Sequence, residues 1–162
     1  MNVTSRVLAA SLVLLMVGCK SSSFQPLKKE VHEDPDTETP VTPTASLAAA
    51  TYAGGNVGIN STGTATLVLT FTHADSTTLA AATGTSSAPP AGLVVVESGA
   101  TCTDIEIVTP TTAGATITVT GCTGDGSISV QVAAGVATSS TTDTNAASTA
   151  RSVVVDNTTP TA

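Results

Sequence analysis

Aromatic and charged residues are scarce in this chain. Aromatic residues make up 2% of its 162 residues, charged residues make up 10%, and tryptophan is absent. Lysine and arginine together number five against twelve acidic residues, which gives a formal net charge of −7. Nucleic-acid binding and polybasic attachment to a membrane both need clustered cations. The charge balance therefore argues against both kinds of partner.

Serine and threonine fill much of the remaining sequence, with 49 residues between them. They occur together with valine and glycine, and few long charged side chains separate them. This composition disfavours long solvent-exposed helices and favours short strands joined by turns. At this chain length the sequence accommodates one domain and its appendages.

The first long apolar run of the chain is too short to cross a bilayer. It extends over eleven residues, from Val7 to Val17, and is interrupted only by Ser11. A transmembrane helix needs about 20 apolar residues. Arg6 precedes the run, and a positive start followed by a short apolar stretch is typical of a secretory signal. We therefore predict that residues 1–18 are a signal peptide.

The end of this run, Met16-Val17-Gly18-Cys19, resembles the lipobox of bacterial lipoproteins, although Met16 stands where leucine is usual. The resemblance implies cleavage before Cys19 and a lipid on its sulfur. Several acyl chains on one residue give stable anchoring. Lys20 stands where the inner-membrane retention signal has aspartate, which favours the outer membrane. The alternative is an ordinary signal peptide with an incidental cysteine.

Residues 19–50 are predicted to form a disordered tether behind the lipid. Four prolines fall in this stretch among serine, threonine and mixed charges, with few large apolar side chains. Such a segment does not bury enough apolar surface to offset the entropy lost on ordering. We expect it to behave as a semi-extended linker that holds a domain away from the membrane.

From residue 51 to residue 156 the pattern changes to short stretches in which every second residue is apolar. This period is typical of half-buried strands, and its repetition at short intervals indicates an all-β sandwich. We predict an immunoglobulin-like antiparallel β-sandwich with about seven strands. The expected strands are 66–71, 93–97, 101–108, 114–122, 127–132 and 152–156, with a weak edge strand at 56–60.

Two cysteines of the predicted domain have the spacing of a cross-strand disulfide. A hairpin with its turn at residues 110–113 that pairs Ile105 with Val119 also places Cys102 opposite Cys122. Directly opposed residues of an antiparallel ladder lie within reach of a disulfide. Because the cysteines differ in parity from Ile105, we expect this bridge on the outer face of the sheet. Two free thiols are the less favourable alternative in an exported domain.

The C-terminal third resembles the second half of a bacterial immunoglobulin-like repeat that occurs in tandem in surface and adhesin-type proteins. The resemblance lies in residues 120–130, 132–138 and 153–160, while the Asp/Asn loop at 142–145 is shorter than usual and lacks glycine. It implies a single repeat followed by residues 157–162 as the stub of an inter-repeat linker.

No convergent catalytic constellation is recognisable. His73, Asp75 and Ser76 lie close together in sequence, but we expect them in a solvated turn at a strand end. Asp104 and Glu106 share one outer strand face. The acidic residues are expected to mark turns and maintain solubility, with calcium binding as the alternative. We therefore predict no catalytic residue, no bound metal and no cofactor other than the lipid on Cys19.

These features favour a non-enzymatic lipoprotein of the cell envelope, anchored through its lipid in the outer membrane or at the cell surface. It would display one immunoglobulin-like module for adhesion, binding or structural roles, with a protein or a polysaccharide as ligand. One alternative is a periplasm-facing lipoprotein that binds a protein partner. Another is the truncated front end of a longer tandem-repeat protein.

Overall fold

A computed structural model describes residues 39–55 and 57–158. The predicted signal peptide, Cys19 and most of the predicted tether lie outside the described residues. The strands are β1 (Thr44–Leu47), β2 (Thr51–Tyr52), β3 (Ala65–Thr72), β4 (Ser76–Thr77), β5 (Ala82–Gly84), β6 (Leu93–Thr111), β7 (Gly114–Val132), β8 (Ala137–Thr138) and β9 (Arg151–Val155). The described residues contain no α-helix and only one 3-10 turn, Ala53–Gly55. The predicted all-β class is confirmed.

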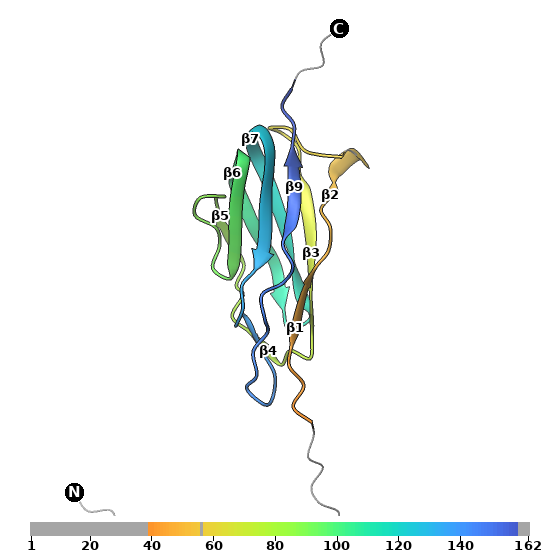
Figure 1. The fold of residues 1–162 in the computed structure, drawn as a ribbon, viewed down its shortest axis with the longest axis vertical. Helices are drawn as coiled ribbons and strands as arrows, with labels where there is room; N and C mark the ends of the chain where they lie inside the picture. The colour runs from red at the N-terminus through yellow and green to blue at the C-terminus, as the bar shows by residue number, and fades with distance from the viewer. Residues whose placement is uncertain (1–38, 56, 159–162) are drawn as a thin grey trace, which may run out of the picture. The chain divides into compact units, whose positions relative to one another are not determined.

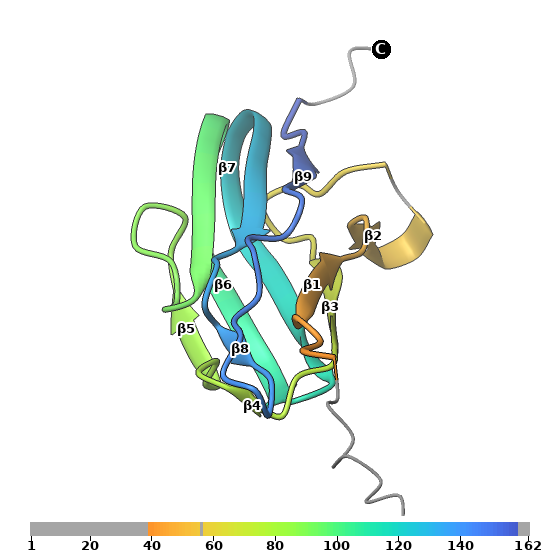
Figure 2. The same ribbon diagram turned by 60° about the horizontal axis from the view of Figure 1, so that its bottom comes forward.

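Seven strands form one continuous antiparallel sheet. Its main order is β1-β3-β7-β6-β5, with β2 paired to β3 and β9 paired to β7. The two remaining strands, β4 and β8, form a small separate sheet. The large sheet folds over on itself, so that its strands lie in the two layers of a sandwich (Figures 1 and 2).

The β6–β7 hairpin contributes strands to both layers. Each strand is 19 residues long, where the sequence predicts two shorter strands in each place. The first half of β6 pairs with the second half of β7, beside β9, and the other halves pair beside β3 and β5. The β6–β7 ladder remains continuous where the hairpin bends, because its register shifts at Ser98/Gly99 and Gly99/Ala100. Gly99 takes up the bend with a φ of 76°.

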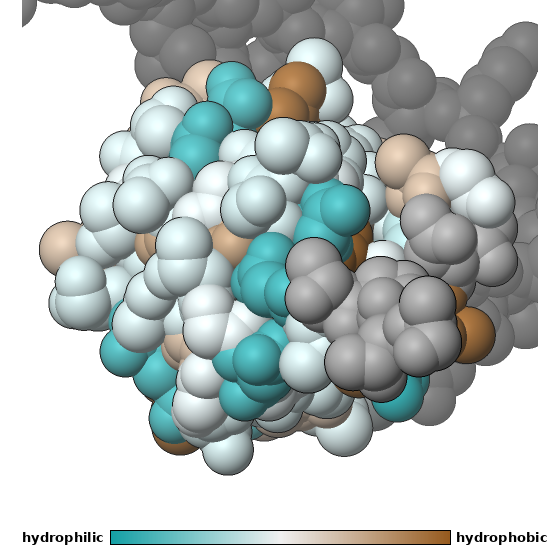
Figure 3. All heavy atoms as spheres, turned by 90° about the horizontal axis from the view of Figure 1, so that it is seen from above, coloured by the Kyte–Doolittle hydropathy of each residue, from teal (hydrophilic) through white to brown (hydrophobic). Residues whose placement is uncertain are grey.

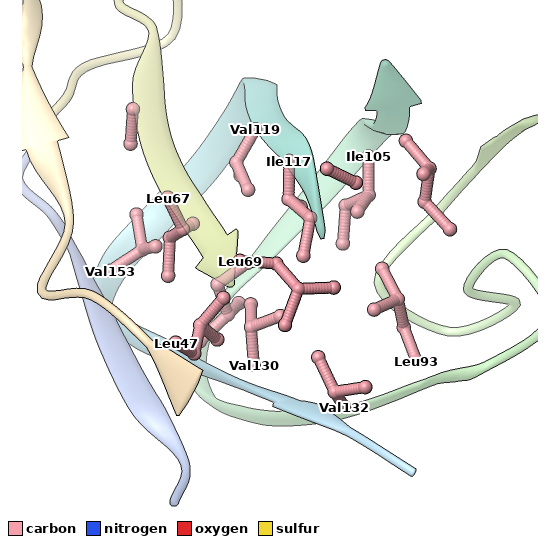
Figure 4. Close-up of a cluster of buried hydrophobic side chains, with 14 of the residues drawn as sticks. Leu47, Leu67, Leu69, Leu93, Ile105, Ile117, Val119, Val130, Val132 and Val153 are labelled. Carbon is pink, nitrogen blue, oxygen red and sulfur yellow. The ribbon is translucent and has the colours of Figure 1, made fainter. Parts of the chain in front are cut away.

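The core between the layers is aliphatic. Figure 4 shows side chains of β3, β6 and β7 facing those of β9 and of the opposite halves of the hairpin. Phe71 is 5% exposed and is the largest side chain in this buried cluster. Its completely buried members include Leu67, Ile105, Ile107, Ile117, Val119, Ile128, Val130, Val132 and Val153. The period-two alternation in the sequence therefore indicates the core faces correctly in most strands.

The folded domain begins before the predicted boundary at residue 51. β1 lies inside the stretch predicted to be tether, and it pairs with β3 from Thr44↔Thr72 to Leu47↔Leu69. Leu47 is 1% exposed. The segment Thr44–Ala50 lacks the apolar alternation of the other strands. Its place in the sheet depends on a single buried leucine and on backbone pairing, which the sequence pattern does not reveal.

The described chain enters and leaves the domain at opposite ends. It enters at the lower end, below β1, and leaves at the upper end, beyond β9, in both ribbon views (Figures 1 and 2). Arg151, at the start of β9, donates a hydrogen bond of 2.7 Å from Nε to the carbonyl oxygen of Leu47 at the end of β1. The first and last strands of the domain are thus joined side chain to main chain.

Candidate functional site

The predicted disulfide is present, but on the opposite face from the one expected. Cys102 and Cys122 are directly paired, with Cα atoms 4.0 Å apart and sulfurs 2.04 Å apart. The predicted pair Ile105↔Val119 is also confirmed, and Ile107 pairs with Ile117 in the same register. The bridge is nevertheless buried, because Cys102 is 2% exposed and Cys122 is fully enclosed.

The change of face has a local cause at Gly121. Its φ of 63° is left-handed, and Thr103 and Gly121 form no ladder pair between Cys102↔Cys122 and Asp104↔Thr120. This break reverses the direction of the side chains in both strands. Cys102 and Cys122, which uninterrupted alternation would place on the outer face, therefore point into the core. Glycine is the residue that adopts such a φ at little cost. The expected position on the outer face was wrong for this reason.

A hollow of about 470 Å³ lies at the lower end of the domain. Phe71, His73, Asp75 and the segment 139–141 contribute to its lining. His73 has a φ of 57°, an uncommon conformation for a residue with a Cβ atom. Ser76, Asp104 and Glu106 are not among the residues that line this hollow. The structure therefore brings His73 and Asp75 to one hollow, and Ser76, which follows Asp75 in the sequence, is not part of its lining.

The acidic residues are dispersed over the described part of the domain. No group of three or more His, Cys, Asp or Glu side chains lies close enough there to hold a metal ion. Several carboxylates instead accept hydrogen bonds from protein groups. Asp125 accepts from the Asn157 N–H, Asp143 from the Thr141 hydroxyl and Glu97 from the Ser86 hydroxyl. Asp104 Oδ1 is buried with no hydrogen-bond partner in the structure.

Local hydrogen bonds lower the pKa of Asp156. The hydroxyl and the N–H of Thr158 both donate to its carboxylate, and these bonds hold the pKa of Asp156 below its ordinary value of 3.8. Hydrogen bonds to the ionised form favour that form. The side chain is fully exposed, so this carboxylate remains charged at neutral pH and acts as a local turn former.

Asn157 joins the end of β9 to two other segments at the upper end of the domain, the turn at Ser61 and the stretch around Gly124. Its Oδ1 accepts from the Ser61 N–H at 2.7 Å, its Nδ2 donates to the Gly124 carbonyl at 2.8 Å, and its N–H donates to Asp125 at 2.7 Å. The sequence places Asn157 in a linker stub after the domain. These bonds instead make it part of the domain, so its upper boundary extends past residue 156. Most of the surface seen from this end is of intermediate hydropathy (Figure 3).

Asn145 has a structural role that the sequence does not reveal. It belongs to the Asp/Asn loop at 142–145, yet it is 1% exposed. Its Oδ1 accepts from the Ala137 N–H at 2.7 Å, and its Nδ2 donates to the carbonyls of Ala133 and Ala146. This amide organises the chain around it, so its role is structural.

Searches for similar proteins give no match to a family model, a curated protein or a solved structure. Among the described residues, no helix has the length and apolar character needed to span a membrane.

Proposed function

We propose that this chain is a non-enzymatic lipoprotein of the cell envelope that displays one immunoglobulin-like domain on a tether anchored through Cys19. The domain serves binding, adhesion or structural roles, with a protein or a polysaccharide as its ligand. The outer membrane is the proposed location. The lipobox-like sequence before Cys19 and the opposite chain ends of the sandwich together suggest this role.

The observation that carries the proposal is the end-to-end path of the described chain. The chain enters the lower end of the sandwich through residues 39–43 and leaves the upper end beyond Val155 (Figure 1). A module threaded in this way projects its far end away from an anchor on its N-terminal side. The buried Cys102–Cys122 bridge supports display outside the cytoplasm, because structural disulfides persist in oxidising compartments.

Proteinase K treatment of intact cells tests the location of the domain. The full chain is expressed in a Gram-negative host and detected with an antibody against residues 51–156, with a periplasmic protein as the protection control. Loss of the domain while the control survives supports outward display. A domain that is digested only after outer-membrane permeabilisation contradicts surface display and favours the periplasm-facing alternative.

Metabolic labelling with palmitate tests the anchor itself. The wild-type chain is expected to incorporate the label, and Cys19→Ala is expected to lose it. Ser21→Ala is the matched control, because it changes a neighbouring small residue and retains the sulfur. Equal labelling of wild type and Cys19→Ala would contradict the lipoprotein proposal.

A further inference from the structure

Three segments of the chain meet at the hollow of about 470 Å³ at the lower end of the domain, beside the small sheet of β4 and β8 (Figure 2). They are residues 71–75 at the end of β3 and beyond it, the β6–β7 turn at residues 112–113, and residues 139–141 after β8. The Phe71 N–H donates to the Ala113 carbonyl, and the Asp75 N–H donates to the Thr138 carbonyl, each at 2.9 Å. These main-chain bonds fix the walls relative to one another, so the hollow is preformed, as binding sites usually are.

The wall at residues 139–141 is held in one conformation by its own hydrogen bonds. Ser139 Oγ and Thr141 Oγ1 are 2.9 Å apart, and the Thr141 hydroxyl donates to the Asp143 carboxylate at 2.8 Å. The Ser139 N–H also donates to the Asp143 carbonyl at 2.9 Å. A loop that is already ordered loses little conformational entropy when it takes up a ligand.

Four polar side chains at the hollow have no partner within the domain. No hydrogen bond or ion pair in the described part of the chain engages the side chains of His73, Asp75, Thr112 or Ser140. His73 takes its place at the hollow with a φ of 57°. Backbone conformations of this kind cost free energy and are concentrated at binding sites. The hollow therefore offers an imidazole, a carboxylate and two hydroxyls to a ligand.

The charges around the hollow disfavour an anionic ligand. Asp75 contributes to the lining, and the Asp143 carboxylate is bonded to the wall through Thr141. Arg151 is the one lysine or arginine among the described residues, and it bonds to the Leu47 carbonyl outside this lining. A phosphate or carboxylate group would thus meet negative charge and find no lysine or arginine to pair with.

The main-chain groups of the walls disfavour an extended peptide. A peptide that adds to a strand needs free N–H and C=O groups along the edge. The N–H groups of Phe71, Asp75 and Ser139 are engaged within the domain, and the Ala113 N–H donates to the Thr111 hydroxyl. The free polar groups described above are instead side-chain groups, and together they donate hydrogen bonds to the hydroxyls of a ligand and accept bonds from them.

We propose that the hollow binds a neutral oligosaccharide. His73 and Asp75 form hydrogen bonds with its hydroxyl groups, and Val41, which lines the hollow and is 47% exposed, packs against the C–H face of a sugar ring. The volume lies within the range of about 300–1,000 Å³ that is usual for sites of small ligands. This inference rests on the binding role proposed above and names a saccharide, rather than a protein, as the ligand.

Binding at this hollow is expected to be weak. His73, Asp75, Thr112 and Ser140 are exposed, so their hydrogen bonds to a sugar replace hydrogen bonds to water and contribute only modestly. We expect dissociation constants in the millimolar range for a single oligosaccharide. Several copies anchored in one membrane would bind a long polysaccharide more tightly than one copy does, because their sites act together.

Nuclear magnetic resonance titration of the purified full chain tests the site. The probes are maltotriose, cellotriose and tri-N-acetylchitotriose, with trigalacturonic acid as the anionic counterpart and a capped tri-alanine as the peptide. We expect at least one neutral trisaccharide to shift the amide resonances of residues 73–75, 112–113 and 139–141, and trigalacturonic acid and tri-alanine to leave them in place. The proposal is overturned if no neutral trisaccharide shifts these resonances, or if the acid or the peptide shifts them more strongly.

Two variants with matched controls assign the binding to the hollow. His73→Gly removes the imidazole and suits the positive φ, so the domain still folds. Thr109→Gly is its control, because Thr109 also has a positive φ, of 47°, but does not line the hollow. Asp75→Ala removes the carboxylate, and Glu106→Ala removes an exposed carboxylate elsewhere.

We expect Asp75→Ala to bind the trisaccharide at least about tenfold more weakly, because hydrogen bonds to a charged group are among the stronger ones. His73→Gly is expected to weaken binding in the same direction, and both controls are expected to bind as the wild type does. Wild-type binding by His73→Gly and Asp75→Ala would overturn the proposal. The palmitate and proteinase K experiments do not depend on sugar binding, so failure of this site is distinguishable from failure of the proposed anchor and display.

Discussion

At the scale of single residues, the buried Asn145 and the positive-φ Gly114 each stabilise the conformation of the chain around them. The side chain of Asn145 makes three hydrogen bonds to main-chain groups of its own neighbourhood. A composition of serine, threonine and asparagine predicts a loop here, but nothing in the sequence distinguishes a buried amide from a solvated one.

Replacing Asn145 with alanine removes the partner of the Ala137 N–H and of two carbonyls. Leaving buried main-chain groups without a partner costs about 1–3 kcal/mol each before the loop relaxes. We expect Asn145→Ala to lower the free energy of unfolding by about 3 kcal/mol in a urea titration. Asn60→Ala is the control, because that exposed side chain bonds only within its own turn. Similar losses for both variants would contradict the structural role of Asn145.

Gly114, the first residue of β7, pairs with Thr70 at one end of the β3–β7 ladder. Its φ is 143°, and a Cβ atom there would overlap the carbonyl oxygen of Leu69. We expect Gly114→Ala to destabilise the domain by more than about 3 kcal/mol.

Gly135→Ala serves as its control, because Gly135 also has a positive φ, of 79°, but a Cβ there meets nothing within 4 Å. This variant is expected to cost about 1 kcal/mol. Thermal unfolding of the two variants beside the wild type measures the difference. Equal costs would show that backbone conformation alone, rather than contact with β3, sets the requirement at Gly114.

At the scale of elements, the alternating apolar pattern predicts the register of the β6–β7 hairpin but not which face every side chain occupies. Pairing the alternating isoleucines and valines predicts the register of Cys102↔Cys122 correctly. It does not predict the face, because alternation is assumed to continue and Gly121 interrupts it. The same glycine-rich stretch suggests a strand end at residue 122, whereas the ladder continues through register shifts. Glycine marks an irregularity in a strand pattern but does not say whether the strand stops or bends.

The disulfide is expected to contribute to stability through its loop. Its cysteines are 20 residues apart in sequence. A loop of this length is worth roughly 3 kcal/mol when it constrains the unfolded chain. The double variant Cys102→Ala/Cys122→Ala should therefore unfold at a lower urea concentration, and reductant should shift the wild type but not the variant. A wild type whose urea midpoint is insensitive to complete reduction would contradict this account.

At the scale of the whole domain, the sequence predicts the interior strands better than it predicts the two ends of the domain. The sequence predicts the interior of the sandwich, residues 65–132, largely correctly because its strands carry the alternating apolar side chains. It misplaces both ends, because β1 and Asn157 are held mainly by hydrogen bonds and by one buried leucine. Every main-chain group and every polar side chain of the chain is able to form hydrogen bonds. The composition therefore does not identify which of them hold the ends of the domain.

A fragment cut at the predicted boundary tests the extended domain. We expect residues 51–158 to be less stable than residues 39–158 by more than about 3 kcal/mol, because the shorter chain lacks Leu47 and exposes the core beneath it. Circular dichroism during heating compares the two fragments. Matching melting temperatures would place the true boundary at residue 51.

The continuity of the β6–β7 hairpin also bears on the order in which the domain assembles. Both halves of the sandwich contain parts of one ribbon, residues 93–132, whose contacts are local in sequence near its turn. Contacts with short chain separation form early, because little loop entropy is lost in making them. Cys102 and Cys122 meet within this ribbon, so an oxidising compartment is expected to close the bridge before β1 and β9, from the two ends of the domain, dock onto it.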